Sequence, residues 1–197
     1  MNKRLDADAL DQLFYRARSY PTWDSRPVPD EMLRELYDLT IMGPTSMNCL
    51  PARFVFVNSP EGKAKLMPAI AEGNLEKVEA APVTVIVAHD THFHEHMALL
   101  WPHSPDAGEM FSQNSPLSET TAFRNGTLQG AYMILAARSL GLDVGPMSGF
   151  DNNRVDAIFF PDGRYRSNFL MNIGFGDESG LYPRGPRLDF EQAVTLV

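Results

Sequence analysis

The feature that most constrains this chain is the run VTVIVA at positions 83–88, which is almost wholly apolar and rich in β-branched residues. β-Branched side chains favour strands, and a strand without an alternating polar face has no side to turn to water. Such a strand has to be covered on both faces. The run therefore predicts a strand that lies between two layers of other elements.

The remaining segments can supply those layers. Helical spacing of apolar residues and helix-start signals are more abundant along the chain than strand-like runs. Helices are predicted at 6–18, 30–42, from 59 onward, 74–80, 117–140 and 151–159, and further strands at 53–57, 142–147 and 168–175. The apolar helix at 117–140 is of a kind that often lies in a dimer interface.

Two segments lack a clear apolar pattern. Residues 89–116 are rich in His, Pro, Ser and Asp, and we expect a long excursion there, either a lid or a partly helical insertion. The tail from Gly176 has no packing face of its own, so we expect it to lie on another surface.

Composition narrows the class of protein. The chain has 197 residues, of which 44% are apolar. This length and composition predict one domain that spans residues 1–197. A formal net charge of −8 argues against nucleic acid as a partner. No stretch reaches the roughly 18 to 20 apolar residues of a membrane span, and the N-terminus lacks the apolar core of a signal peptide. We therefore expect no membrane partner and a cytoplasmic location.

No glycine-rich motif for a dinucleotide or a triphosphate is present, so a bound phosphate would need arginines. Arg16, Arg18 and Ser19 lie at the end of the first predicted helix, and Arg184 and Arg187 lie near the C-terminus. Guanidinium groups present a planar fork of donors that suits phosphate oxygens. The alternative is that arginines near a helix C-terminus only favour the helix dipole.

Two further groups of polar residues are candidates for binding. Thr45, Ser46 and Asn48 follow Gly43-Pro44 on a tight loop, and their hydroxyl and amide groups suit a polyhydroxy chain. Asn74 and Lys77 lie one helical turn apart and could address the polar edge of a heterocycle. The alternatives are a simple helix stop for the loop and a solvated surface for the pair.

Histidines gather in the excursion, where His92, His94 and His96 alternate and His89 lies just before them. No cysteine or second ligand cluster accompanies them, so we predict no metal site. Cys49, the single cysteine, allows no internal disulfide and has no His or Asp beside it in sequence. We interpret it as a small buried side chain rather than a nucleophile.

Taken in order, these segments resemble the nitroreductase family of flavoproteins. The similar stretches are Arg18-Ser19, PTSMNCLPA at 44–52, GNLEK at 73–77, GLDVGPMSGFD at 141–151, and Arg187. The resemblance covers nearly the whole chain. It implies an α+β, nitroreductase-like fold, in which a mixed central sheet is wrapped by helices in an intertwined homodimer.

The resemblance also implies that FMN is bound at two sites in the dimer interface, with NADH or NADPH as the electron donor. The residues that it places around FMN are Arg16, Arg18, Ser19, Pro44, Thr45, Ser46, Asn48, Asn74, Lys77, Pro146, Met147, Ser148, Gly149, Arg184 and Arg187. Hydride would pass through the flavin N5 in a ping-pong cycle, and Lys77 would stabilise negative charge on the reduced ring.

Within the family, the strings GPTSMNCLPAR, GNLEKVEAAPVT and GPMSGFD are similar to the subgroup of the malonic semialdehyde reductase of pyrimidine degradation. The implied acceptor is a small carbonyl compound, malonic semialdehyde, which would be reduced to 3-hydroxypropionate. Arg53, Phe123 and Arg124 are the candidate substrate contacts, and Arg53 or Arg124 would face the carboxylate. The alternatives are a broad nitro or quinone reductase and a flavin-binding protein without turnover.

The chain departs from the family pattern at three positions. Pro21 stands where a second basic residue is frequent, and Leu50 and Ala52 replace a Gln and a Trp of the polar loop. Arg53 is our candidate to compensate for these losses. No residue is assigned as the proton donor.

Overall fold

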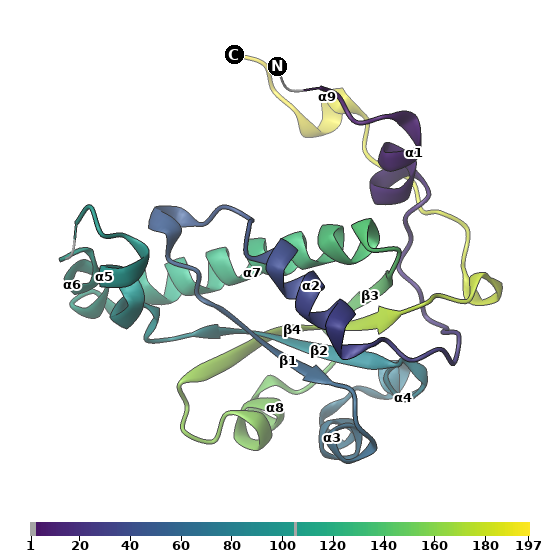
Figure 1. The fold of residues 1–197 in the computed structure, drawn as a ribbon, viewed down its shortest axis with the longest axis horizontal. Coiled ribbons are helices and arrows are strands. Elements are labelled where there is room, and N and C mark those ends of the chain that lie inside the picture. The colour runs from purple at the N-terminus through teal and green to yellow at the C-terminus, as the bar shows by residue number, and fades with distance from the viewer. Residues whose placement is uncertain (1–2, 105) are drawn as a thin grey trace.

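A four-stranded sheet runs through the middle of the computed structural model, which describes residues 3–104 and 106–197 (Figure 1). The strands are β1 (Ala52–Val57), β2 (Val83–Asp90), β3 (Asp143–Met147) and β4 (Tyr165–Gly174). Their order across the sheet is β1-β2-β4-β3, and each neighbouring pair is antiparallel. A single bridge between Ser19 and Val144 adds a parallel contact at the β3 edge.

β2 confirms the prediction of a doubly covered strand, because all of its residues are buried. Val85 and Val87 face the core under α2 (Asp30–Thr40) and α7 (Ser115–Ser139). Ile86 and Ala88 face the opposite core. That second core is covered by α3 (Pro60–Leu66), α4 (Leu75–Ala80) and α8 (Asn152–Phe159) (Figure 1). The fold is therefore three layers with β2 at the centre.

The helix starts follow the capping signals of the sequence. The Ser59 hydroxyl accepts from the Gly62 N–H at 3.0 Å at the start of α3. The Asp151 carboxylate accepts from the Arg154 N–H at 3.1 Å at the start of α8. The first helix, α1 (Ala7–Leu10), continues as a π-helical turn to Tyr15, within the predicted range. The last strand begins at Tyr165, three residues before the predicted start.

The excursion after β2 is a partly helical insertion, as predicted. It contains a 3-10 turn (Phe93–His96), α5 (Met97–Leu100) and α6 (Ala107–Ser112). Phe93, Met97 and Phe111 close a third small core around Cys49, which is fully buried. Burial raises the pKa of the Cys49 thiol to about 11, so the thiolate is scarce at neutral pH and the side chain packs rather than reacts.

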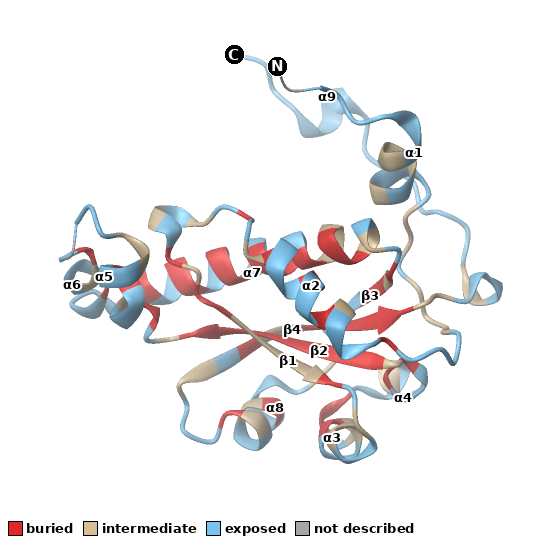
Figure 2. Cartoon of the chain, in the orientation of Figure 1, coloured by how far each residue is buried: buried red, intermediate tan, exposed pale blue. Residues whose placement is uncertain are grey.

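The two ends of the chain lie side by side and project from the sheet (Figure 1). Residues 182–197, which include α9 (Phe190–Ala193), are exposed throughout, whereas β2 is buried along its whole length (Figure 2). Leu188, Phe190 and Leu196 are among the large apolar side chains left exposed there. Among the described residues, no helix combines the length and apolarity that crossing a membrane requires.

Candidate functional site

One group of the predicted residues gathers along the β3 edge of the sheet, and we call it the edge cluster (Ser19, Asn74, Lys77 and Gly149). Ser19 bridges to Val144 of β3. The Asn74 side-chain amide donates to the Gly149 carbonyl at 3.2 Å, and the Lys77 ammonium donates to Asn74 Oδ1 at 3.1 Å. Segments that are far apart in sequence therefore meet here, at the loop that follows β3.

Glycines allow the close approach of these segments. A Cβ on Gly149 would overlap the Asn74 side-chain nitrogen, so a larger residue would push the loop away from α4. A Cβ on Gly145 would lie 2.6 Å from the Tyr20 carbonyl oxygen and would separate the N-terminal arm from β3. Pro146 and Met147 end β3 between these two glycines, and Ser148 follows them. The spacing of the glycines thus fixes the shape of the edge cluster.

The arginines predicted for a phosphate lie on the two projecting ends. Arg18 donates to the Tyr182 carbonyl, and Arg184 Nη2 donates to the Tyr15 and Ala17 carbonyls at 2.7 and 2.8 Å. Among the described residues, Arg187 donates only within its own turn, to the Gly185 and Pro186 carbonyls. Arg16 makes a loose, exposed pair with Asp11 at 3.6 Å. The N-terminal arm and the tail are therefore tied together near Arg18, and Arg187 lies beyond that tie.

The second group of predicted residues, which we call the strained loop (residues 44–50), lies elsewhere. Its backbone is held to α7, where the Ser46 N–H donates to Asn125 Oδ1 at 2.8 Å. The Thr45 hydroxyl accepts from the Leu50 N–H at 3.2 Å. The Asn48 side-chain amide donates to the Leu100 carbonyl of α5 at 3.0 Å. These contacts fix the loop that Pro44 begins.

The strained loop has an unusual backbone. Met47, Asn48 and Leu50 have φ values of 52°, 52° and 37°, and they are the only non-glycine residues of the described chain in the left-handed region. Bulky residues pay roughly 1 kcal/mol or more for that conformation, and such strain tends to occur at binding sites. The loop is therefore a functional candidate on backbone geometry, independently of its motif.

The strained loop does not meet the N-terminal arm, which carries Ser19 of the edge cluster, in the described part of one chain. The strained loop contacts α7 at Asn125, whereas the N-terminal arm contacts α7 at Arg138, whose carbonyl accepts from Gln12 at 2.6 Å. These two residues are 13 positions apart on the helix, which corresponds to about 20 Å along the helix axis. Figure 1 shows the same separation, with the strained loop and the terminal segments at opposite ends of α7.

The outward face of α7 is unexpectedly apolar. The helix buries small and polar residues such as Thr121, Asn125 and Gln129, and it exposes Phe123 (55%) and Leu128 (47%). A shallow hollow of about 640 Å³ lies on this face, between Thr120 and Ala131, and Arg124 lies on its wall. The sequence predicted an apolar helix in need of cover. Met133, Ala136 and Ala137 join this chain's own core, whereas Phe123 and Leu128 are exposed.

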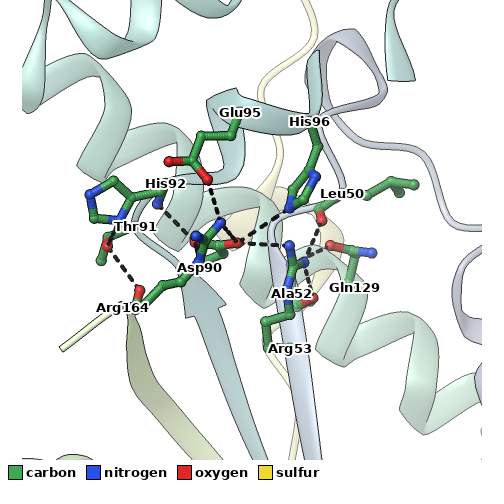
Figure 3. A network of polar contacts seen from close by, with 10 residues as sticks. All are labelled: Leu50, Ala52, Arg53, Asp90, Thr91, His92, Glu95, His96, Gln129 and Arg164. Carbon is green, nitrogen blue, oxygen red and sulfur yellow. Dashed lines mark hydrogen bonds and ion pairs between the residues drawn. The ribbon is translucent and has the colours of Figure 1, made fainter. Parts of the chain in front are cut away.

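A network of charges at the other end of the sheet was not predicted (Figure 3). Asp90, at the end of β2, is fully buried, and its carboxylate pairs with Arg53 at 2.8 Å and with Arg164 at 3.2 Å. Arg164 also pairs with Glu95 at 2.8 Å, and His96 lies 3.8 Å from Asp90. An acid directly after a fully apolar strand was the available signal, because a buried carboxylate needs partners.

This network defines what Arg53 can do. Its Nη2 is held by Asp90, and its Nη1 donates to the Leu50 and Ala52 carbonyls at 3.1 and 2.8 Å. The guanidinium therefore supports the end of the strained loop. Its predicted contact with a substrate carboxylate would compete with Asp90, whereas Arg124 has no such competitor on the open face of α7.

No described group of three or more His, Cys, Asp and Glu side chains is arranged to hold a metal ion. His92, His94 and His96 lie on the 3-10 turn and its start, so they do not share the face that a strand would have given them. The alternation of histidines in the sequence therefore does not create a metal-binding geometry in the part of the chain that the structure describes.

Comparison with known proteins completes this description. The family model described as Nitroreductase family matches residues 3–175. A Burkholderia lata protein, named provisionally as an NADH dehydrogenase/NAD(P)H nitroreductase, is 61% identical over 98% of both chains. A provisionally assigned nitroreductase of Bacillus subtilis superposes with a TM-score of 0.88 at 22% identity, covering 98% of this chain and all of its own.

A second structure is that of a provisionally assigned nitroreductase from Exiguobacterium sibiricum in complex with FMN. It superposes with a TM-score of 0.82 at 21% identity over the whole of both chains. At these identities the two structures show the fold alone, and they confirm the predicted nitroreductase-like, α+β fold.

Proposed function

The chain belongs to the nitroreductase family, and from this premise we propose that it works as a homodimeric, FMN-dependent NAD(P)H oxidoreductase. The names of its relatives support the electron donor, and the FMN complex of the Exiguobacterium sibiricum protein supports the cofactor. The finer assignments below rest on this chain's own residues.

The observation that carries the proposal is the separation of the edge cluster from the strained loop. Each group supplies polar donors, and about 20 Å of α7 separates the strained loop from the N-terminal arm, which carries Ser19 of the edge cluster. A two-fold partner brings the loop of one chain to the edge cluster of the other, because a two-fold interface presents each surface to both chains. The exposed apolar face of α7 supplies surface for such an interface.

The residues present fit FMN in their chemistry. Arg18 and Ser19 offer a guanidinium and a hydroxyl on the N-terminal arm, and Arg187 adds a second guanidinium from the tail. Thr45, Ser46 and Asn48 offer hydroxyl and amide groups. Gly149 leaves room for the Asn74 side chain, which therefore packs directly against the loop after β3.

Lys77 has a defined task in this site. Bound FMN would supply the hydride chemistry between a nicotinamide and an acceptor. The Lys77 ammonium, held in place by Asn74 at 3.1 Å, would stabilise the negative charge of the reduced ring. Asn74 is itself fixed by the Gly149 carbonyl, so the charge is preorganised rather than mobile.

For the acceptor we propose a small carbonyl compound, with malonic semialdehyde as the first candidate. Arg124 on the exposed face of α7 would bind its carboxylate, and Phe123 would cover the ring side of the site. The second candidate is a broad nitro or quinone reductase, which the names of the relatives favour. Such an enzyme would have no need of Arg124.

The first experiment is an anaerobic titration of the purified protein with NADH and NADPH, followed by addition of acceptors. The proposal predicts a yellow dimer whose colour is bleached by at least one nicotinamide. Malonic semialdehyde, a nitroaromatic compound and a quinone then separate the acceptors. A protein that stays colourless and monomeric at saturating FMN would refute the proposal.

The role of Lys77 is tested separately. Lys77→Ala should lower the reduction potential of the bound flavin or slow its reduction, because a fixed positive charge is removed from beside the ring. Lys65→Ala, which removes an exposed ammonium from α3, is the matched control and should change neither. If the two variants had the same flavin reduction potential and the same rate of flavin reduction, Lys77 would not stabilise the reduced flavin.

A further inference from the structure

A cavity of about 560 Å³ lies where β2 ends and β4 begins. Its walls come from the end of β2, the segment 91–94, α6, the first turns of α7, and the loop before β4 together with the start of β4. The volume is in the range that accepts a drug-sized ligand. Phe123 apart, none of the lining residues belongs to the set expected to hold FMN or the acceptor.

The cavity wall contains polar groups that lack partners. His89 is 8% exposed, and its Nδ1 has no hydrogen-bond partner in the described chain. The buried Nδ1 of His94 on the same wall also lacks one. Ser118, which is 6% exposed, adds a hydroxyl beside them. Buried polar atoms are nearly always paired, so two unpaired nitrogens in the wall of one hollow are exceptional.

The cavity wall contains one guanidinium and one carboxylate. Arg166 of β4 lines the cavity and makes no ion pair with any described residue, whereas the acid of the wall, Glu119, accepts from the Ser115 hydroxyl at 3.2 Å. Burial, and then the charge of Arg166, lowers the pKa of His89, although Asp156 and Asp90 oppose this. Burial and His92 likewise lower the pKa of His94. Both imidazoles are thus neutral at neutral pH.

The apolar part of the wall is aromatic. The rings of His89 and Phe123 meet edge to face with centroids 6.1 Å apart, and Phe111 lines the wall from α6. Phe111 is itself held by Phe93 at 4.9 Å between centroids. A flat ring packs well against such groups, because aromatic pairs prefer edge-to-face and offset contacts.

We propose that this cavity binds a small aromatic carboxylate, with its carboxylate between Arg166 and His89 and its ring against Phe111 and Phe123. A guanidinium binds a carboxylate through two parallel hydrogen bonds, and a neutral imidazole supplies one donor more. This site is additional to the proposed oxidoreductase reaction, and its occupation does not depend on turnover.

The test uses the full-length, FMN-loaded dimer with its histidine rings labelled for NMR. The chain has five histidines, so the ring signals of His89 can be assigned by substitution of the others. The probes are phenylacetate, its neutral analogue phenylacetamide, and inorganic phosphate. We expect phenylacetate to shift the His89 signals saturably and phenylacetamide to bind at least about tenfold more weakly, since it lacks the charge that Arg166 recognises.

Arg166→Gln should weaken phenylacetate binding about tenfold or more. It should leave the fold intact because the side chain is exposed. Lys65→Gln removes one positive charge from α3 and is the matched control, for which we expect unchanged binding.

Four results would overturn the proposal: His89 signals that do not move, equal binding of phenylacetate and phenylacetamide, binding of phosphate in place of phenylacetate, or equal binding by the two variants. A change in the flavin spectrum without a shift at His89 would place the ligand elsewhere and would also overturn it.

Discussion

The two ends of α7 lie in opposite kinds of surroundings. At its N-terminal end, the insertion after β2 closes its own core around Cys49, and Asp90 ties that end of the sheet to Arg53 and Arg164. At its C-terminal end, the two chain termini project outward, and residues 182–197 are wholly exposed (Figure 2). The first end forms its own core and ion-pair network within one chain, whereas the second leaves apolar side chains of the tail exposed.

This difference indicates which end determines the stability of the fold and which end determines the binding of ligand and partner. Buried ion pairs and packed cores hold the self-contained end, so changes there should alter the free energy of unfolding. The terminal end is exposed, so changes there should alter the affinity for ligand and partner and leave the fold unaffected. Substitutions at each end test this division.

Asp90→Ala should have the largest effect. It leaves the guanidinium groups of Arg53 and Arg164 without their buried carboxylate, which typically costs about 3–5 kcal/mol of unfolding free energy. Urea denaturation measures this loss. Asp24→Ala removes the exposed partner of Arg26 and should cost no more than about 1 kcal/mol. Similar losses in both variants would contradict the contrast between the two ends.

Arg187→Ala should affect binding and not folding. Its guanidinium contacts only its own turn in this chain, so the free energy of unfolding of the apo protein should not change. Hydrogen bonds to charged groups contribute roughly 1.5–3 kcal/mol, so the affinity for FMN should fall about tenfold or more. Fluorescence titration with FMN measures it, and Arg34→Ala on α2 is the control. An unchanged affinity for FMN would show that the tail does not contribute Arg187 to the proposed site.

The pH dependence of stability should originate at the self-contained end. His89 and His94 have pKa values below their ordinary value of 6.5, first because of burial. The unfolded chain therefore takes up protons before the folded chain does, so stability is full above about pH 6.5 and declines as the pH falls below it. Thermal unfolding from pH 8 to 5 measures the decline, and His89→Gln should flatten it. If His89→Gln had the same decline of stability with falling pH as the unmodified protein, His89 would not be the source of that decline.

Met47→Gly should have the smallest effect and the opposite sign. Met47 has a φ of 52°, which glycine adopts without steric cost, so the variant should gain up to about 1 kcal/mol. Met42→Gly, at an exposed position outside the left-handed region, should instead lose stability, because glycine only loosens the unfolded chain there. Denaturation curves of both variants give the comparison, and a loss at Met47 would show that the side chain outweighs the strain.

The local elements of the fold could be predicted from the sequence because their signals are local. The apolar run of β2, the cap at Ser59 and the cap at Asp151 each depend on residues within one or two turns. The position of β4 was less accurate, since Tyr165 and Arg166 look like loop residues until the pairing with β2 is known.

The predicted site residues divide into those that the structure brings together and those that it separates. Asn74 and Gly149 meet, although they are 75 positions apart, and their motifs predicted the shared site. The partnership of Asp90 with Arg164 had no motif, because two charged residues 74 positions apart carry no local pattern. The same holds for the cavity at His89, whose walls come from five segments.

The buried thiol of Cys49 makes the self-contained end observable without any added label. A thiol-directed reagent needs the thiolate, and it can reach this sulfur only when the insertion lifts away from the sheet. The rate of alkylation in native buffer therefore reports how often that end opens, and it does so at one atom of the chain. Because Cys49 is the single cysteine, the rate at which free thiol is lost measures the opening of the insertion, and no other thiol contributes to the signal.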